Sequence, residues 1–225
     1  MLGTIVNVGA VIVGSIIGLI VHTKLPKRII TIVFQGIGLF TIFIGIKMAL
    51  KTDHLLIMVF SIVIGSVIGE MINIEKGINK LSEYLKRKIK IINDKFSEGL
   101  ITAFLLFCLG SMTIIGSIEE GLGGRPNLLM TKSLMDGFSS IALSASLGIG
   151  VIFSVIPLLI YQGGLTLFAG YLQNFFAQTM INELTAVGGI LLIGLGINIL
   201  EILKLRISNM LPSLIIVITL VLIFL

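Results

Sequence analysis

The sequence is a succession of long apolar stretches, each close to the length that a helix needs to cross a lipid bilayer. A helix rises 1.5 Å per residue and the hydrocarbon core is about 30 Å thick, so about 20 apolar residues span it. A mean hydropathy of +1.15 with 12% charged residues excludes an ordinary soluble domain. We therefore expect an all-α, multi-pass transmembrane helix bundle forming one integral membrane domain over residues 1–225. The stretches run roughly over 3–22, 29–50, 55–74, 99–118, 134–156, 158–177, 185–203 and 209–225.

Basic residues predict how these stretches alternate across the membrane. They cluster after the first stretch, after the third and after the seventh, where Lys204 and Arg206 lie. Because cytoplasmic loops are enriched in Lys and Arg, an even number of crossings should separate the second cluster from the third. This rule favours eight crossings with both termini outside. Seven crossings remain an alternative, since only two charges define the third cluster and the stretch 158–177 could be re-entrant.

Small residues recur within the odd-numbered stretches. The first contains Gly14 and Gly18, and the third contains Gly65 and Gly69 in the same small-xxx-small pattern. A looser copy follows around Gly194 and Gly196, and Gly148 and Gly150 belong to two small-residue stripes of the fifth stretch. Such glycines let helix backbones approach closely in lipid. The repetition predicts tandem glycine-rich hairpins.

The segment 73–98 differs from its surroundings because it is strongly basic and amphipathic. Apolar residues recur there at helical spacing among seven lysines and arginines. This pattern favours a connecting helix on the cytoplasmic leaflet that contacts anionic membrane lipid. Two readings stay open: a solvated connector that fixes topology, or a surface that binds lipid or a partner. With one aromatic residue between Lys76 and Lys95 and no recognition fold, it does not predict nucleic-acid binding.

The order of several motifs resembles a known family. GTIVNVGAVIVGSIIG opens the chain, and GSMTIIGSIEEGLGG, KSLMDG, SLGIGVIFSVIP and YQGGLT follow in order. Together these resemble the bacterial YdfK/YqgA-type integral membrane family, domain of unknown function 554. The resemblance implies a multi-pass protein of the bacterial inner (cytoplasmic) membrane, and it brings no mechanism with it.

The stretch 134–156 contains more polar residues than the other apolar stretches, and it is the best candidate for a functional site. At helical spacing, Asp136, Ser140 and Ser144 lie along one stripe that continues to Gly148. A carboxylate there could bind a cation or a proton, with the serines as hydrogen-bond partners. Alternatively, Asp136 is a carboxylate near a helix start, paired with Lys132 four residues earlier.

Two further groups of residues could belong to the same site. Ser117, Glu119 and Glu120 end the fourth stretch, where the acids could form a vestibule for a cationic solute or an ordinary outer loop. Gln162, Gly163 and Gly164 predict either a tight turn or a break in a helix, whose exposed backbone groups could hold an ion or a solute.

The chain carries no sequence signature of an enzyme. HExxH, GxSxG, CxxC and Walker motifs are absent, so we expect no enzymatic activity, no cofactor and no metal site. The remaining expectation is a small secondary transporter or facilitator of an unknown small solute or ion. A channel is one alternative, and a non-transporting protein that binds lipid or a partner through 73–98 is another. A homo-oligomer is also open, because eight short helices enclose little polar volume.

Overall fold

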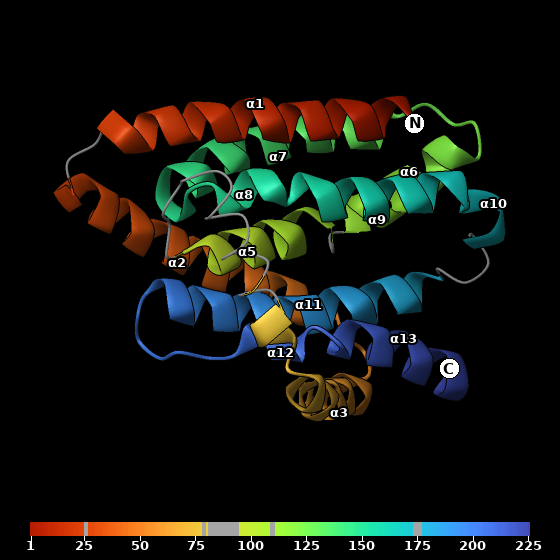
Figure 1. The fold of residues 1–225 in the computed structure, drawn as a ribbon. Coiled ribbons are helices and arrows are strands. Elements are labelled where there is room, and N and C mark those ends of the chain that lie inside the picture. Colours follow the sequence, from red (N-terminus) through yellow and green to blue (C-terminus); the bar gives the residue numbers. More distant parts are fainter. Residues whose placement is uncertain (25–26, 78–79, 81–94, 109–110, 173–176) are drawn as a thin grey trace. The chain divides into compact units, whose positions relative to one another are not determined.

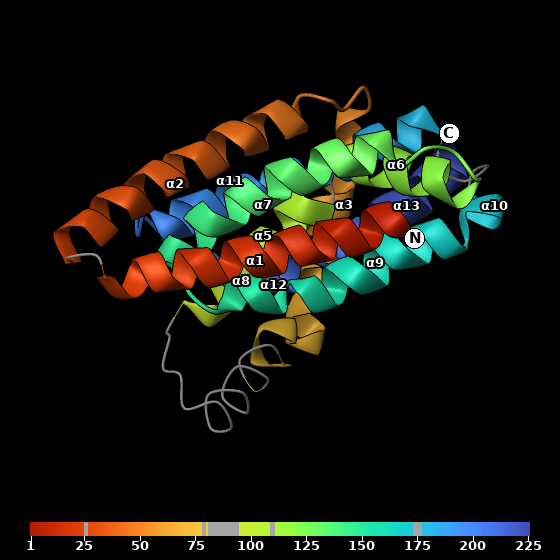
Figure 2. The same ribbon diagram turned by 90° about the horizontal axis from the view of Figure 1, so that it is seen from above.

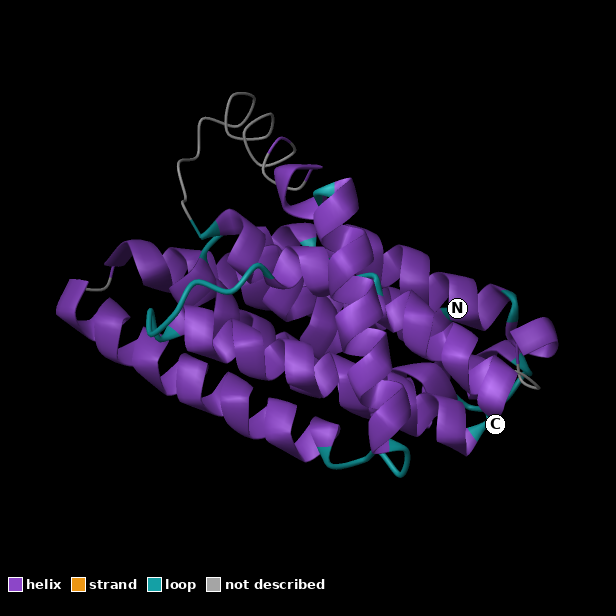
Figure 3. Cartoon of the chain, turned by 90° about the horizontal axis from the view of Figure 1, so that it is seen from below, coloured by secondary structure: helices purple, strands orange, loops and turns teal. Residues whose placement is uncertain are grey.

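The computed structural model describes residues 1–24, 27–77, 80, 95–108, 111–172 and 177–225. Every regular element in these ranges is an α-helix, which confirms the all-α class (Figure 3). Most of the basic segment 73–98, and with it the predicted amphipathic helix, lies outside the described residues. The helices are α1 (Leu2–Lys24), α2 (Lys27–Ala49), α3 (Leu55–Ile72), α5 (Phe96–Cys108), α6 (Ser111–Gly121), α7 (Asn127–Leu147), α8 (Gly150–Phe153), α9 (Val155–Leu167), α10 (Ala169–Leu172), α11 (Gln178–Ile199), α12 (Ile207–Met210) and α13 (Ser213–Phe224).

Several described segments are long and apolar enough to cross a membrane. Five qualify directly, namely Leu2–Val21, Leu55–Ile72, Gly150–Leu167, Gln178–Ile199 and Ile207–Phe224. A sixth would be α5 with α6, whose axes differ by 59°. The helix α7 is outside this set, since Lys132, Asp136 and five serines lower its hydropathy. The structure thus shows a membrane-type helical protein, while the count of eight crossings stays a prediction.

The described chain divides into two compact units that alternate along the sequence. The first comprises Met1–Ile37 and Glu98–Ala177, and the second comprises Gly38–Ser97 and Gln178–Leu225. The helix α2 contributes residues to both.

In the first unit, α1 runs beside α7 in the same direction (Figures 1 and 2). The contacts advance together along both helices: Gly3 lies against Leu129, and Gly14 lies against Gly137 and Ser140. Any side chain at Gly14 would collide with the α7 backbone. Glycine therefore permits a backbone approach that no larger residue allows.

Two more pairs complete this arrangement. The helices α6 and α9 run in the same direction, with Gly121 against the backbone of Thr166. The helices α1 and α9 run in opposite directions, since Thr4 lies opposite Thr166 while Asn7 reaches back to Gln162. The starts of α1 and α7 and the ends of α6 and α9 consequently share one end of the unit.

The second unit uses the same kind of close approach. On α3, Gly65 abuts the backbone of Ser213 and Gly69 abuts the carbonyl of Asn209, so α3 runs antiparallel to α12 and α13. The helix α11 contacts α2 in the same manner: Gly189 lies against Gly45 and Ala49, and Gly196 lies against Gly38 and Ile42, while Gly194 faces Ile207.

These partners differ from the predicted tandem hairpins. The glycine face of α1 packs on a helix more than a hundred residues later, and that of α3 packs on the last two helices. The repeated glycine pattern therefore marks helices that pack closely. The helices they pack against are distant in sequence and are not the next helix of a hairpin.

The predicted boundary between the fifth and sixth stretches is wrong. The turn falls at Gly148, where φ is +76°, a backbone conformation that glycine adopts without strain. Pro157 lies in the first turn of α9, where its missing N–H costs no helical hydrogen bond. Gln162, Gly163 and Gly164 lie inside α9, so neither the predicted turn nor the predicted helix break occurs there.

Candidate functional site

A buried ion pair occupies one face of α7. Lys132 and Asp136 are separated by one helical turn, and the ammonium contacts carboxylate oxygen Oδ2. The two residues are only 4% and 6% exposed. A single charge at the centre of a membrane helix costs about 2.5–3.5 kcal/mol on insertion scales, and removing one partner of a buried pair leaves such a charge behind. Each residue therefore depends on the other.

An amide from α1 joins this ion pair to α9. The Nδ2 group of Asn7 donates to Oδ2 of Asp136 at 3.0 Å and to Oε1 of Gln162 at 2.9 Å. Asn7 and Gln162 are completely buried. Three helices that are distant in sequence thus meet at one amide.

The network continues through two hydroxyls toward the shared end of the helices. Gln162 donates from Nε2 to the Thr4 hydroxyl at 3.3 Å, and the hydroxyls of Thr4 and Thr166 lie 3.4 Å apart. Thr166 donates in turn to the carbonyl of Gln162 at 3.0 Å. Asn7 is five residues into α1, so this amide lies about 8 Å inside that end.

The bent pair α5–α6 borders the same site. Lys132 Nζ lies 5.8 Å from the ring centroid of Phe107, which is next to the last residue of α5. The carbonyl of Phe107 accepts a hydrogen bond of 2.8 Å from the hydroxyl of Thr113 on α6. The C-terminal end of a helix attracts a cation, as does an aromatic face. Both effects favour an ammonium at this position.

Some buried oxygens of the first unit have no hydrogen-bond partner among the described residues. The most informative is Oδ1 of Asn7, because the same amide already uses its nitrogen twice. Ser117 Oγ is another, and its place one turn before Gly121 puts it on the face of α6 that meets α9. The hydroxyl of Ser144, Oε2 of Glu120 and the hydroxyl of Tyr161 also lack partners. Unpaired buried oxygens are costly, so an arrangement with several of them can accept a ligand.

The other residues of the predicted stripe face α1. Ser140 donates to the carbonyl of Gly137 at 2.7 Å and lies against Gly14, while Ser144 lies against Gly18. Both serines are fully buried. They line the close α1–α7 contact next to the ion pair.

The remaining predicted residues lie at varying distances from the network. Gly163 is buried and lies near the side chain of Met1, whereas a Cβ added to the half-buried Gly164 would meet no atom within 4 Å. Glu120 accepts from the backbone N–H of Gly3 at 2.8 Å through Oε1. Glu119 is exposed and packs against Gly124. The structure therefore groups Asp136 with Gln162, places Glu120 at the end of the unit, and leaves Glu119 at its surface.

The predicted site lacks four residues that the structure places in the network: Asn7, Thr4, Lys132 and Thr166. A sequence signal exists for Asn7, since it is an amide inside an otherwise apolar first stretch. The partner of that amide could not be read from the sequence, because it lies 129 residues away.

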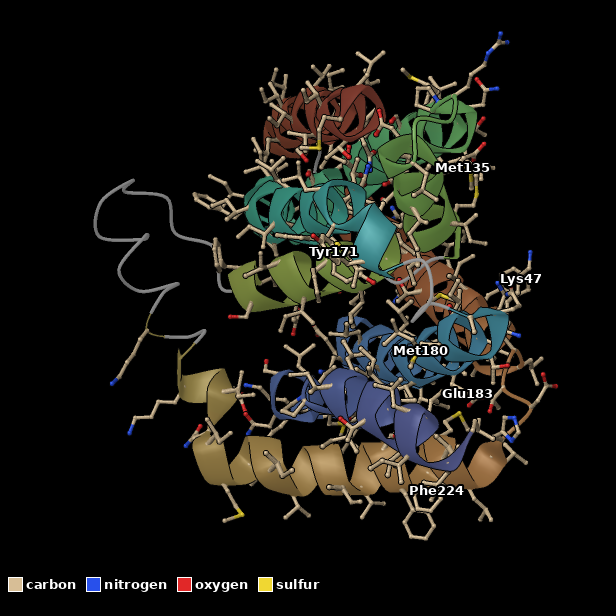
Figure 4. The ribbon with its side chains drawn as sticks, turned by 90° about the vertical axis from the view of Figure 1, so that its right-hand side faces the viewer. Lys47, Met135, Tyr171, Met180, Glu183 and Phe224 are labelled. Atoms are coloured by element: carbon tan, nitrogen blue, oxygen red, sulfur yellow. The ribbon has the colours of Figure 1, made fainter. Side chains whose placement is uncertain are left out.

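The second unit has a buried carboxylate with an evident structural role. Glu183 of α11, labelled in Figure 4, is fully buried and accepts from the Thr52 hydroxyl at 2.6 Å. It also accepts from the backbone N–H groups of Asp53 at 3.0 Å and His54 at 3.2 Å. These groups precede α3, so Glu183 caps that helix from a neighbouring one.

Charged residues at the opposite end of this unit pair with one another. Glu70 contacts Arg206 through Oε1 and accepts from Nδ2 of Asn209 at 2.7 Å through Oε2. Lys95 and Glu201 form an exposed pair at 3.1 Å. Exposed pairs of this kind contribute little to stability and are typical of helix ends.

Taken with the fold, the buried network defines a class: a helical membrane protein with a polar site enclosed by α1, α7 and α9. Residues 2–222 match the family described as Protein of unknown function (DUF554), and the chain belongs to that family.

Two relatives cover nearly the whole chain. The uncharacterized membrane protein YdfK of Bacillus subtilis (strain 168) is 37% identical over 222 residues, which is 96% of this chain and 93% of the relative. The uncharacterized protein YqgA of Escherichia coli (strain K12) is 32% identical over 219 residues, or 95% and 93% of the two chains. No solved structure matches.

Proposed function

We propose that this protein is a small secondary transporter or facilitator that moves a small solute or ion across the bacterial inner membrane. The observation that carries the proposal is the buried Lys132–Asp136 pair with its amide partners Asn7 and Gln162. Intramembrane charges are expensive, and where they occur they commonly mark a pathway. A bent helix pair beside the charges is a second feature shared with transporters.

The proposed roles follow from position. Asp136 is the charged binding group, Gln162 is a hydrogen-bonding partner, and Ser140 and Ser144 extend the polar face away from the entrance. Glu119 and Glu120 lie at the entrance itself, with Ser117 between them and the network. The glycine contacts at Gly14 and Gly18 would let α1 and α7 slide over one another during alternating access.

The proposed topology has eight crossings, with α7 and α9 both crossing and both termini outside. The helix directions within each unit support it. α1 and α7 are parallel, α6 and α9 are parallel, and α3 is antiparallel to α13, as the parity of eight crossings requires.

Two other functions predict different outcomes. A channel would use the same residues without saturation or counter-transport. A protein that binds lipid or a partner through the basic segment 73–98 would lose function on charge reversal there and would be insensitive to Asp136.

The deciding experiment combines binding and flux for wild type and Asp136→Asn. Thermal unfolding of the detergent-purified protein is measured against ions, amino acids, organic acids and amines. A ligand at about 100 times its Kd stabilises the native state by about 2.7 kcal/mol. We expect one solute class to stabilise wild type and not Asp136→Asn, and to enter proteoliposomes in an Asp136-dependent manner. The control is Asp53→Asn, an exposed carboxylate of the second unit. Uptake that Asp136→Asn leaves unchanged would refute the proposed site.

A further inference from the structure

We infer that Asp136, Asn7 and Gln162 form a binding site for a monovalent cation, and that the ammonium of Lys132 balances the charge of Asp136 while the cation is absent. The inference rests on the proposed function and specifies its ligand. The cation would bind when Lys132 leaves Asp136 and would be expelled when Lys132 returns.

The donor set is the first argument. The site offers carboxylate oxygen from Asp136 and carboxamide oxygen from Asn7 and Gln162, with the hydroxyls of Thr4 and Thr166 next along the network. Oxygen ligands select hard cations. The described residues contain no cluster of three or more His, Cys, Asp or Glu side chains that could hold a metal ion. One carboxylate neutralises one positive charge, so the site suits a monovalent ion rather than a divalent one.

The unpaired oxygen of Asn7 is the second argument. Oδ1 is buried and has no hydrogen-bond partner among the described residues, although the nitrogen of the same amide contacts both Asp136 and Gln162. A buried carbonyl oxygen beside a carboxylate is an acceptor without a donor, and a cation would satisfy it. Ser117 Oγ, also buried and unpaired, lies on the face of α6 turned toward α9.

The asymmetry between the two charged residues is the third argument. Asp136 is fixed by the amide of Asn7, which Gln162 holds in turn. Lys132 contacts Asp136 and the ring of Phe107, and it lies one turn closer to the start of α7. A long flexible stem lets a lysine ammonium move toward water while the stem stays in apolar surroundings. Lys132 is therefore the partner that leaves, and Asp136 is the one that stays.

Charge balance then makes the exchange one for one. With Lys132 in place, the site is neutral, and with Lys132 withdrawn and one cation bound, it is neutral again. Binding the cation without releasing Lys132 would bury an excess positive charge, and releasing Lys132 alone would leave Asp136 unpaired.

The test is direct binding of ²²Na⁺ to the full-length, detergent-purified protein, with Li⁺ and K⁺ as competitors. Replacing Lys132 by Gln removes the internal competitor, so we expect ²²Na⁺ to bind Lys132→Gln at least tenfold more tightly than wild type. Asp136→Asn should bind none. Lys47→Gln, which removes an exposed lysine of α2 (Figure 4), should bind as wild type does. Equal affinity in Lys132→Gln and wild type, or retained binding in Asp136→Asn, would overturn the inference.

A second variant keeps the test decisive if Lys132→Gln does not fold. Asn7→Ala retains the ion pair and removes the whole carboxamide, that is, the unpaired oxygen and the two hydrogen bonds of its nitrogen, so ²²Na⁺ affinity should fall at least tenfold. Unchanged affinity in a folded Asn7→Ala protein contradicts the cation site. Asp136-dependent stabilisation by an uncharged or anionic solute, with no ²²Na⁺ binding, would overturn the cation site and leave the transporter proposal standing. Binding of ²²Na⁺ without any Asp136-dependent flux would support the cation site and count against transport.

Discussion

At the residue scale, the first unit depends on a single amide. Asn7 uses both of its N–H hydrogens, one toward Asp136 on α7 and one toward Gln162 on α9. Because these bonds are inside a membrane-type bundle, no water is at hand to replace them. Interhelical hydrogen bonds of this kind average about 0.6 kcal/mol in membrane proteins, and bonds to charged groups reach about 1.5–3 kcal/mol in general.

Replacing Asn7 by Val should therefore lower the free energy of unfolding by about 1–3 kcal/mol. The substitution removes two hydrogen bonds and leaves Oδ2 of Asp136 with Lys132 alone. Unfolding of the purified protein in mixed micelles measures the change. Gln178→Ala, which removes an exposed hydrogen bond to Asn182, is the control and should change stability by less than about 0.5 kcal/mol. Equal stability of Asn7→Val and wild type would show that the amide bonds contribute nothing.

Glu183 should prove structural rather than functional. Replacing it by Ala leaves the Thr52 hydroxyl and the backbone N–H of Asp53 without this acceptor, while the N–H of His54 keeps only the Thr52 hydroxyl, so we expect a loss of about 2–4 kcal/mol in the free energy of unfolding. Glu183→Gln retains one carbonyl acceptor and should lose less. Flux per folded molecule should be unaffected in both variants. A selective loss of flux in well-folded Glu183→Gln would move this residue into the transport pathway.

The candidate site was only partly predictable from single residues. An acid in an apolar stretch is conspicuous, so Asp136 could be selected from the sequence, and its spacing from Lys132 made an ion pair one of two readings. Contacts such as Asn7 to Asp136 depend on which helices become neighbours, which local patterns do not encode. Gln162 and the two glycines after it look like a turn locally, yet packing of α9 against α1 and α6 keeps that segment helical.

At the element scale, glycine decides which helices can touch. Gly14 and Gly18 on α1 face the backbone of α7, and Gly65 and Gly69 on α3 face the backbone of α12 and α13. Without a hydrophobic driving force between helices in lipid, close van der Waals contact must supply much of the association. The sequence pattern identified these helices correctly as packing elements. It could not identify their partners, because small-xxx-small spacing describes only one side of a contact.

A matched pair of glycine substitutions on α1 tests whether glycine is required for the close contact between α1 and α7. A Cβ at Gly14 would collide with Ser140 Oγ and the carbonyl of Gly137, whereas nothing lies within 4 Å of a Cβ at Gly9. Gly14→Ala should therefore destabilise the protein by about 1–3 kcal/mol through overpacking. Gly9→Ala should be neutral or slightly stabilising, because alanine favours helix. Thermal unfolding of the two variants in the same detergent gives the comparison, and a tolerated Gly14→Ala would mean that α1 and α7 are not held so closely.

At the scale of the whole molecule, the eight-crossing topology predicts which side of the membrane each loop faces. Loops at 50–54 and 122–126 should face outward, and those at 73–77 and 200–206 should face the cytoplasm. In a Cys108→Ala background, Asp53→Cys and Gly123→Cys should react with a membrane-impermeant maleimide on intact cells. Glu75→Cys and Lys204→Cys should react only after the cells are opened. Labelling of Lys204→Cys in intact cells would favour the seven-crossing alternative.

The overall class was the most predictable property of the chain, and the helix boundaries were less so. Apolar length and charge placement suffice for a membrane helical protein. The end of α7 at Gly148 depends instead on one residue with positive φ, and Pro157, which separates the predicted stretches 134–156 and 158–177, lies within α9 because the first turn of a helix tolerates proline.

The interleaving of the two units also bears on how the chain is made. The first unit is completed by residues 98–177, so α1 emerges from the ribosome long before α7, its closest partner, has been synthesised. The helix α7 carries two charged residues and five serines, and it is too polar to favour hydrocarbon strongly by itself. We expect it to enter the bilayer together with α1, whose Asn7 meets Asp136 there. Insertion of this protein should accordingly be a late, cooperative event rather than a sequence of independent hairpins, and N-terminal fragments that stop before α7 should be targets for membrane proteases.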